Sequence, residues 1–223
     1  HKDDICAIIL EPVQAEGGDH HFRVEFMEQL KSLADENEAM LVFDEVQTGV
    51  GLSGKFWLHE HFGEKARPDI VAFGKKMQVC GILVGPKVDE IETNVFKVPS
   101  RINSTWGGNL VDMVRATKIL EIIEEENLLD HVEQLGDYLL ERLRTIQKEQ
   151  GMISNIRGKG LLAAFDFENS ELRNQFIRKG MENGALFLGC GNKSVRFRPA
   201  LNIQKSELDR GLDIMAGTLK TMS

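Results

Sequence analysis

Apolar runs of strand length alternate with a helix-like stretch over the first third of the chain. Residues 5–10 form a continuous apolar run, which is the pattern of a strand buried on both faces of a parallel sheet. A helix-like stretch over residues 24–38 follows, and residues 40–43 and 69–73 form two further apolar strands. This alternation predicts an α/β layer, in which ligands bind at the carboxyl ends of the strands. Those ends carry Glu11, Asp44, Glu45 and the segment 74–76.

Helical spacing dominates the first part of the second half. Apolar residues recur at helical spacing over residues 108–150, with an expected break between two helices at Asn127. Short strands are expected over residues 161–167, 185–188 and 194–197, and Ser206 and Asp209 have the spacing of a helix cap. This pattern predicts a small α+β domain attached to a long helix.

Composition and charge narrow the classes of partner. The 27 Lys and Arg residues against 35 Asp and Glu give a net charge of −8, so neither nucleic acid nor an anionic membrane is expected as a partner. No apolar run approaches the roughly 20 residues of a membrane span. The three cysteines form no CxxC pair, which favours reduced thiols in a cytoplasmic protein. Because the chain begins with His1 and a strand follows at once, we expect it to be the C-terminal part of a longer protein.

Two residues of opposite charge follow two of the predicted strands. Asp44 and Lys75 are 31 residues apart, a spacing that suits two parallel strands joined by a crossover. On its own the pair is equally compatible with a satisfied buried ion pair and with a reactive site. The neighbouring residues favour the second. The runs FDEVQTGVG at residues 43–51 and PDIVAFGK at residues 68–75 resemble the class III aminotransferases, and similar motifs continue in the family's order from residue 11 to about residue 201.

This resemblance implies a fold and a cofactor. Class III aminotransferases are fold type I enzymes that use pyridoxal 5′-phosphate, and they begin well before the position that matches His1. The chain is thus expected to be the C-terminal portion of such an α/β enzyme. Residues 1–112 would belong to the cofactor-binding large domain with its mainly parallel sheet, and residues 113–223 would form the long connecting helix and the small α+β domain.

The resemblance also implies roles for the residues near the two strand ends. Lys75 would bind the cofactor aldehyde through its amine and then move the substrate proton, with the adjacent Lys76 as the alternative. Asp44 would pair with the pyridine nitrogen and keep it protonated. Gln47 would hydrogen-bond the ring hydroxyl, and Val46 would pack on the ring face.

A second motif, SRINSTWGGN, occupies residues 100–109. A hydroxyl before two glycines at a helix start suits an anion, because free backbone N–H groups attract phosphate, although the same pattern is also an ordinary cap. The resemblance implies that Thr105 reaches the cofactor phosphate of a partner subunit, so a homodimer with shared sites is expected. Asn103 of the same run would bind substrate.

A third pair combines Glu16, in EPVQAEGGD at residues 11–19, with Arg196, in VRFRP at residues 195–199. The resemblance implies that Arg196 binds a substrate carboxylate and that Glu16 covers it when the substrate has none. Glutamate reacts at a carbon that bears a carboxylate, whereas the reacting carbon of a terminal amine bears none. One site must therefore expose the arginine to the first substrate and neutralise it for the second. Arg198 is the nearby alternative.

The amine donor follows from finer motifs. FGKKMQVCG at residues 73–81 and the run over residues 99–115 look like the lysine 6-aminotransferase branch of the family. That branch would move the ε-amino group of L-lysine to 2-oxoglutarate, giving glutamate and 2-aminoadipate 6-semialdehyde. The residues 189–191 and 194–199 also resemble 4-aminobutyrate aminotransferases, which is the alternative. An inactive remnant that only dimerises or binds a partner is the alternative from another class.

The remaining candidates are expected to be structural. His20, His21, His59 and His61 have neither HExxH spacing nor a cysteine nearby, so no metal site is expected. Glu45, next to Asp44, is expected to be a structural charge.

Overall fold

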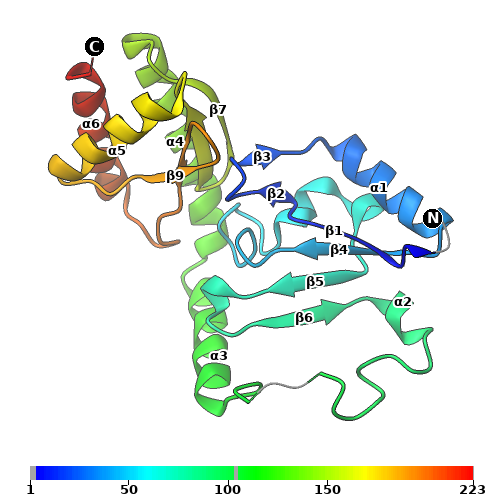
Figure 1. The fold of residues 1–223 in the computed structure, drawn as a ribbon. Helices are drawn as coiled ribbons and strands as arrows, with labels where there is room; N and C mark the ends of the chain where they lie inside the picture. Colours follow the sequence, from blue (N-terminus) through cyan, green and yellow to red (C-terminus); the bar gives the residue numbers. More distant parts are fainter. Residues whose placement is uncertain (1–3, 103–104, 223) are drawn as a thin grey trace. The chain divides into compact units, whose positions relative to one another are not determined.

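The computed structural model describes residues 4–102 and 105–222, and the chain divides into two compact units (Figure 1). The first unit comprises His1–Pro12, Phe22–Val50 and Trp57–Glu125, and the second comprises Val13–His21, Gly51–Phe56 and Glu126–Ser223. The predicted boundary between the large and small domains, at residues 112 and 113, refers to complete family members and stays a prediction. Within the described residues, no helix is long and apolar enough to span a membrane.

The first unit is built on a four-stranded sheet of order β1-β4-β5-β6 (Figure 1). Its strands are β1 (Ala7–Leu10), β4 (Met40–Asp44), β5 (Ile70–Phe73) and β6 (Gly81–Val84). β1, β4 and β5 run parallel, whereas β6 pairs antiparallel with β5. The three strands predicted from apolar runs are therefore present and the α/β class is confirmed. The added strand β6 makes the sheet mixed.

The other elements of this unit connect or cover the strands. Within the described residues they are α1 (Val24–Glu36), α2 (Pro86–Asp89), α3 (Leu110–Glu125), and the 3₁₀ turns η2 (Leu58–Phe62), η3 (Glu64–Ala66) and η4 (Lys75–Met77). Helix α1 packs on β4 and matches the helix predicted from residue 24.

The prediction that residues 5–10 are buried on both faces is wrong. Ile5, which precedes β1, is 57% exposed, and Ile9 within β1 is 68% exposed. Ala7 and Ile9 are both exposed and share one face of β1, because side chains alternate along a strand. β1 is also at the edge of the sheet. The apolar run identifies a strand, but it does not show which described residues cover it.

The second unit contains an antiparallel sheet of order β7-β8-β10-β9. Its strands are β7 (Ser154–Lys159), β8 (Leu162–Asp166), β9 (Leu188–Cys190) and β10 (Ser194–Phe197), and its helices are α4 (Leu128–Gln150), α5 (Ser170–Glu182) and α6 (Lys205–Lys220). A short hairpin of β2 (Val13–Gln14) and β3 (His20–His21) belongs to the same unit. The predicted break at Asn127 is confirmed, since this residue has φ 48° between α3 and α4.

Two predicted boundaries in this unit need correction. The strand expected over residues 185–188 lies at Leu188–Cys190, where its backbone pairs with β10. The last helix is capped two residues before Ser206: Gln204 is the cap, and the Glu207 carboxylate accepts the Gln204 N–H at 2.8 Å. Gln204 and Glu207 form a capping box, in which the side chain of each accepts the backbone N–H of the other, and Asp209 is not part of it.

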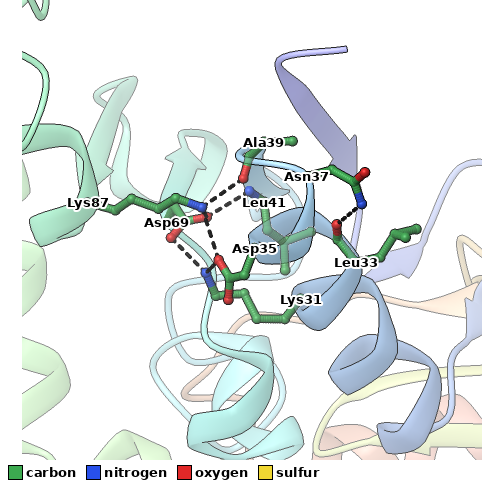
Figure 2. A network of polar contacts seen from close by, with 8 residues as sticks. All are labelled: Lys31, Leu33, Asp35, Asn37, Ala39, Leu41, Asp69 and Lys87. Carbon is green, nitrogen blue, oxygen red and sulfur yellow. Dashed lines mark hydrogen bonds and ion pairs between the residues drawn. The ribbon is translucent and has the colours of Figure 1, made fainter. Parts of the chain in front are cut away.

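A buried carboxylate ties β4 to β5 in the first unit (Figure 2). Asp69, which is 7% exposed, directly precedes β5, and its carboxylate accepts the backbone N–H of Leu41 at 2.8 Å. The same carboxylate pairs with the Lys31 amine from α1 at 2.9 Å. Asp69 therefore links the starts of both strands and joins them to α1, which packs on β4.

We predict that Asp69→Asn lowers the free energy of unfolding by about 2–4 kcal/mol, because it removes a buried charge that satisfies Lys31. The matched control is Asp35→Asn. Asp35 lies 2.7 Å from the same Lys31 amine but is 48% exposed, so we expect a loss below about 1 kcal/mol. Urea unfolding followed by circular dichroism measures both values. Equal losses in the two variants would contradict the role given to Asp69.

Candidate functional site

The carboxyl ends of β4 and β5 lie side by side in the first unit. The parallel register pairs Asp44 with Ala72, and the backbone N–H of Glu45 donates to the Ala72 carbonyl at 2.9 Å. The half-buried Asp44 carboxylate accepts the N–H of Val46 at 3.0 Å through Oδ1. The chain after β4 thus holds this carboxylate in a defined orientation at the sheet edge.

Glu45 is engaged within the protein. It is 1% exposed, and its carboxylate accepts the Thr48 hydroxyl at 2.6 Å and the backbone N–H groups of Leu58 and His59 at 3.0 and 2.8 Å. The His59 ring nitrogen Nδ1 lies 3.0 Å from the same carboxylate. These bonds give Glu45 and His59 a structural role. No group of three or more metal-ligating side chains occurs in the part of the chain that the structure describes.

Lys75 and Lys76 differ in their surroundings. Lys75 opens η4 directly after Gly74 with φ 33°, a left-handed conformation that costs a non-glycine residue energy and is common at functional sites. Its side chain is exposed and has no hydrogen bond or ion pair within the described residues. The Lys76 amine instead donates to the carbonyls of Gln47 and Gly49 at 2.5 and 3.2 Å. Lys76 thereby ties the loop after β4 to the turn after β5.

Val46 also contacts this turn. A Cβ added at Gly74 would lie 3.5 Å from a methyl carbon of Val46 and 3.0 Å from the Cys80 sulfur. The tighter of the two distances is to Cys80, so the glycine before Lys75 leaves room for the Cys80 side chain beside this turn. Asp44, Val46, Gln47 and the Lys75 turn form one continuous edge of the first unit.

The second motif is described in part. Thr105 is exposed in a turn over residues 105–108, and the Asn109 side chain accepts the N–H of Val111 at 2.9 Å at the start of α3. Asn109 therefore caps the start of α3. The predicted substrate residue Asn103 lies outside the described residues.

Glu16 and Arg196 form an ion pair in the second unit. Nη1 of Arg196 lies 2.6 Å from the Glu16 carboxylate; the Arg196 side chain is 13% exposed and that of Glu16 is 71% exposed. The alternative, Arg198, pairs instead with Asp19, whose side chain is fully buried. An exposed carboxylate can move away from its partner at little cost, whereas a buried one cannot. Of the two arginines, Arg196 is thus the one whose partner can be exchanged.

Sequence reasoning missed the buried charges around this pair. Burial raises the pKa of Asp19, and the neighbouring Arg198 guanidinium opposes that rise. Arg157 on β7 donates to the backbone carbonyls of Gly18 and Asp19. In the sequence, the two glycines before Asp19 indicate a turn. The neighbouring residues do not indicate which distant arginines contact Asp19.

Comparison with known proteins places the chain in a family. The class-III aminotransferase family matches residues 1–219, and the chain belongs to this family. It is 47% identical over 218 residues to the L-lysine-epsilon aminotransferase of Amycolatopsis lactamdurans, covering 96% of this chain and 48% of that protein. It is 36% identical over 219 residues to the mitochondrial 4-aminobutyrate aminotransferase of Mus musculus, covering 98% of this chain and 43% of that protein.

A solved structure gives the same result. The lysine aminotransferase from M. tuberculosis matches with a TM-score of 0.94 at 45% identity, covering 97% of this chain and 50% of that chain. The predicted resemblance to class III aminotransferases and the fold type I architecture are confirmed. The chain spans about half the length of the curated relatives it matches.

We predict that His21 makes the second unit less stable in mild acid. Burial, aided by the positive charge of Arg157, lowers the pKa of His21 from 6.5 to about 4. As the pH falls from 6.5 toward 4, His21 is protonated in the unfolded chain but not in the folded chain. The free energy of unfolding therefore declines by up to about 1.4 kcal/mol per pH unit.

Urea unfolding at pH 7 and pH 5 tests this. His21→Gln should lose less stability than the native protein between these two values. His20→Gln is the matched control, because the neighbouring His20 side chain is exposed, and it should behave like the native protein. An unchanged pH dependence in His21→Gln would show that this histidine does not cause the decline.

Proposed function

We propose that the protein is a pyridoxal-phosphate-dependent aminotransferase that moves the ε-amino group of L-lysine to 2-oxoglutarate, giving glutamate and 2-aminoadipate 6-semialdehyde. Family membership supports amino transfer, and the 47% identity to an L-lysine-epsilon aminotransferase supports lysine as the donor. The observation that carries the proposal is the edge where Asp44 and Lys75 follow adjacent parallel strands, with the neighbouring Lys76 amine bound to backbone carbonyls.

The residues of this edge fit pyridoxal 5′-phosphate. An aldehyde needs an accessible amine, and the exposed Lys75 amine has no partner within the described residues. A protonated pyridine nitrogen needs a carboxylate, and Asp44 presents one that its own loop orients through the Val46 N–H. When bound, this cofactor supplies an electron sink for the carbon that loses its proton.

Each residue has a distinct task in this proposal. Asp44 holds a proton at the ring nitrogen, while the Gln47 side chain bonds the ring hydroxyl and Val46 packs on the ring face. The Lys75 amine binds the cofactor and then moves the proton of the reacting carbon. Thr105 contributes a hydroxyl to the cofactor phosphate.

The protein is a homodimer in this proposal, with Thr105 acting in the site of the partner subunit. Large apolar side chains next to Thr105 support an interface: Trp106 is 77% exposed, Leu110 is 80% exposed and Val114 is 70% exposed. Exposed apolar patches of this kind are typical of surfaces that associate. A cytoplasmic location is part of the same proposal, since Cys6, Cys80 and Cys190 are free thiols.

Arg196 and Glu16 let one site accept two kinds of substrate. With L-lysine, the reacting carbon bears no carboxylate, and the Glu16 carboxylate neutralises the Arg196 guanidinium. With glutamate or 2-oxoglutarate, the substrate carboxylate pairs with Arg196 in the bidentate manner that a guanidinium favours, and the exposed Glu16 moves aside. Asn103 is proposed to bind substrate as well. 4-Aminobutyrate is the second candidate donor, supported by the 36% identity to the mouse enzyme.

Half-reaction kinetics test this proposal with the protein at its full natural length. We predict that L-lysine is a better donor than 4-aminobutyrate. In Glu16→Gln, kcat/KM for L-lysine should fall about tenfold, because Arg196 stays charged against a donor without the matching carboxylate, while kcat/KM for glutamate changes less than about twofold.

Glu182→Gln is the matched control, because it removes the same charge from an exposed site on α5 and should leave both values unchanged. A higher kcat/KM for 4-aminobutyrate than for L-lysine would make 4-aminobutyrate the donor in place of lysine. An unchanged ratio of the two half-reactions in Glu16→Gln would remove the role of Glu16. No amino transfer from any donor would overturn the enzyme proposal.

A further inference from the structure

The position of Glu16 depends on a turn that its own side chain does not hold. Glu16 lies between β2 and β3, where the N–H groups of Gly18 and Asp19 both donate to the Ala15 carbonyl, at 3.3 and 3.1 Å. Its side chain is 71% exposed, so packing does not fix it. The backbone of Glu16 is held by the Gly191 N–H, which donates to the Glu16 carbonyl at 2.9 Å, and further contacts hold the residues after it.

Arg157 adds two side-chain contacts to this turn, beside the ion pair that Arg198 forms with Asp19. Its Nε donates to the Asp19 carbonyl at 2.8 Å, and its Nη2 donates to the Gly18 carbonyl at 2.6 Å. The planar guanidinium can bind two neighbouring carbonyls at once, which a flexible ammonium cannot match. Arg157 thus binds Gly18 and Asp19, which follow Glu16 by two and three residues.

The same guanidinium is anchored to the sheet that carries Arg196. Its Nη1 lies 2.9 Å from the Asp166 carboxylate on β8, and its Nη2 donates to the Ser194 hydroxyl on β10 at 3.1 Å. The Ser194 hydroxyl in turn donates to Asp166 at 2.7 Å. Because Asp166 neutralises Arg157, this arginine is not available to compete with Arg196 for a carboxylate.

The strand register places the two arginines in one row. Arg157 on β7 and Arg196 on β10 both pair with Ala164 on β8, so the three side chains stand on the same face of the sheet. The small Ala164 lies between the two long side chains. Arg157 therefore connects the turn of Glu16 to the strand of Arg196 across one strand.

A bulge in β7 is what aims Arg157 at this face. Ser154 pairs with Asp166 and Arg157 with Ala164, so three steps along β7 match two along β8. Asn155, inside the bulge, has φ 49°, and its side chain donates to Asp166 at 2.9 Å. Without the extra residue, the side chain of Arg157 would point to the opposite face, since strand side chains alternate.

We propose that Arg157 is a positioning residue, which sets Glu16 against Arg196 and thereby sets the preference between terminal amines and dicarboxylates. This inference rests on the proposed function, because it concerns the same Glu16–Arg196 pair. Arg157 acts through the turn and through Ser194.

Three variants of the protein at its full natural length test the proposal. We predict that Arg157→Met lowers kcat/KM for L-lysine about tenfold and leaves that for glutamate within about twofold, as Glu16→Gln does. Combining Arg157→Met with Glu16→Gln should give no further shift, because both act through one contact. Arg157→Lys keeps a charge beside Asp166, so it should retain the native melting temperature while still shifting the preference.

Hydrogen exchange supplies a readout that does not depend on activity. In Arg157→Met, the amides of residues 13–21 should exchange about tenfold faster, whereas those of β8 stay protected. Arg178→Met is the matched control, since Arg178 is exposed on α5 and should change neither exchange nor preference.

The outcomes separate the two proposals. A shift with Glu16→Gln but none with Arg157→Met would overturn the positioning role and leave the Glu16–Arg196 exchange intact. No shift with Glu16→Gln would overturn both. Unchanged exchange of residues 13–21 in Arg157→Met, or additive shifts in the double variant, would also overturn the positioning role.

Discussion

The candidate cofactor site depends on the parallel register between β4 and β5. At one end of these strands, the buried Asp69 carboxylate binds the Leu41 N–H and the Lys31 amine. At the other end, the same register sets Asp44 opposite Ala72, two residues before Gly74 and the Lys75 turn. A slip of one residue would move the Asp44 carboxylate to the other face of the sheet, because side chains alternate along a strand. The candidate site at the carboxyl ends of these strands is thus held by an ion pair at their opposite ends.

Burial divides the charges of the second unit into fixed and exchangeable ones. Arg157 and Arg198 are paired with carboxylates that are almost or fully buried, Asp166 and Asp19, which hold these arginines in place. The partner of Arg196 is exposed to solvent. Since breaking a buried pair is far costlier than separating an exposed one, Arg196 is the arginine that we propose as the receiver of a substrate carboxylate. In this proposal, the fixed pairs keep the surrounding structure constant while Arg196 changes partner.

Local patterns in the sequence revealed the parts of the fold that local forces decide. The apolar runs before Asp44 and Lys75 identify β4 and β5, and Asn127 marks the break between α3 and α4. The exposure of Ile9 could not be predicted in this way, because burial of a strand depends on what packs against it. The contact of Arg198 with Asp19 joins residues 179 positions apart, and no local pattern encodes such a partner. The bulge that aims Arg157 is equally invisible, since it is defined by pairing with β8.

The central claim is that Lys75, in the turn that directly follows β5, is the amine that binds the cofactor. Its most direct test is borohydride reduction of the full-length protein in the presence of pyridoxal 5′-phosphate, followed by mass spectrometry of the labelled peptides. We predict saturable labelling confined to Lys75, lost in Lys75→Ala and retained in Lys76→Ala, because the Lys76 amine is bound to the carbonyls of Gln47 and Gly49. Labelling at Lys76, or labelling scattered over surface lysines, would contradict the account.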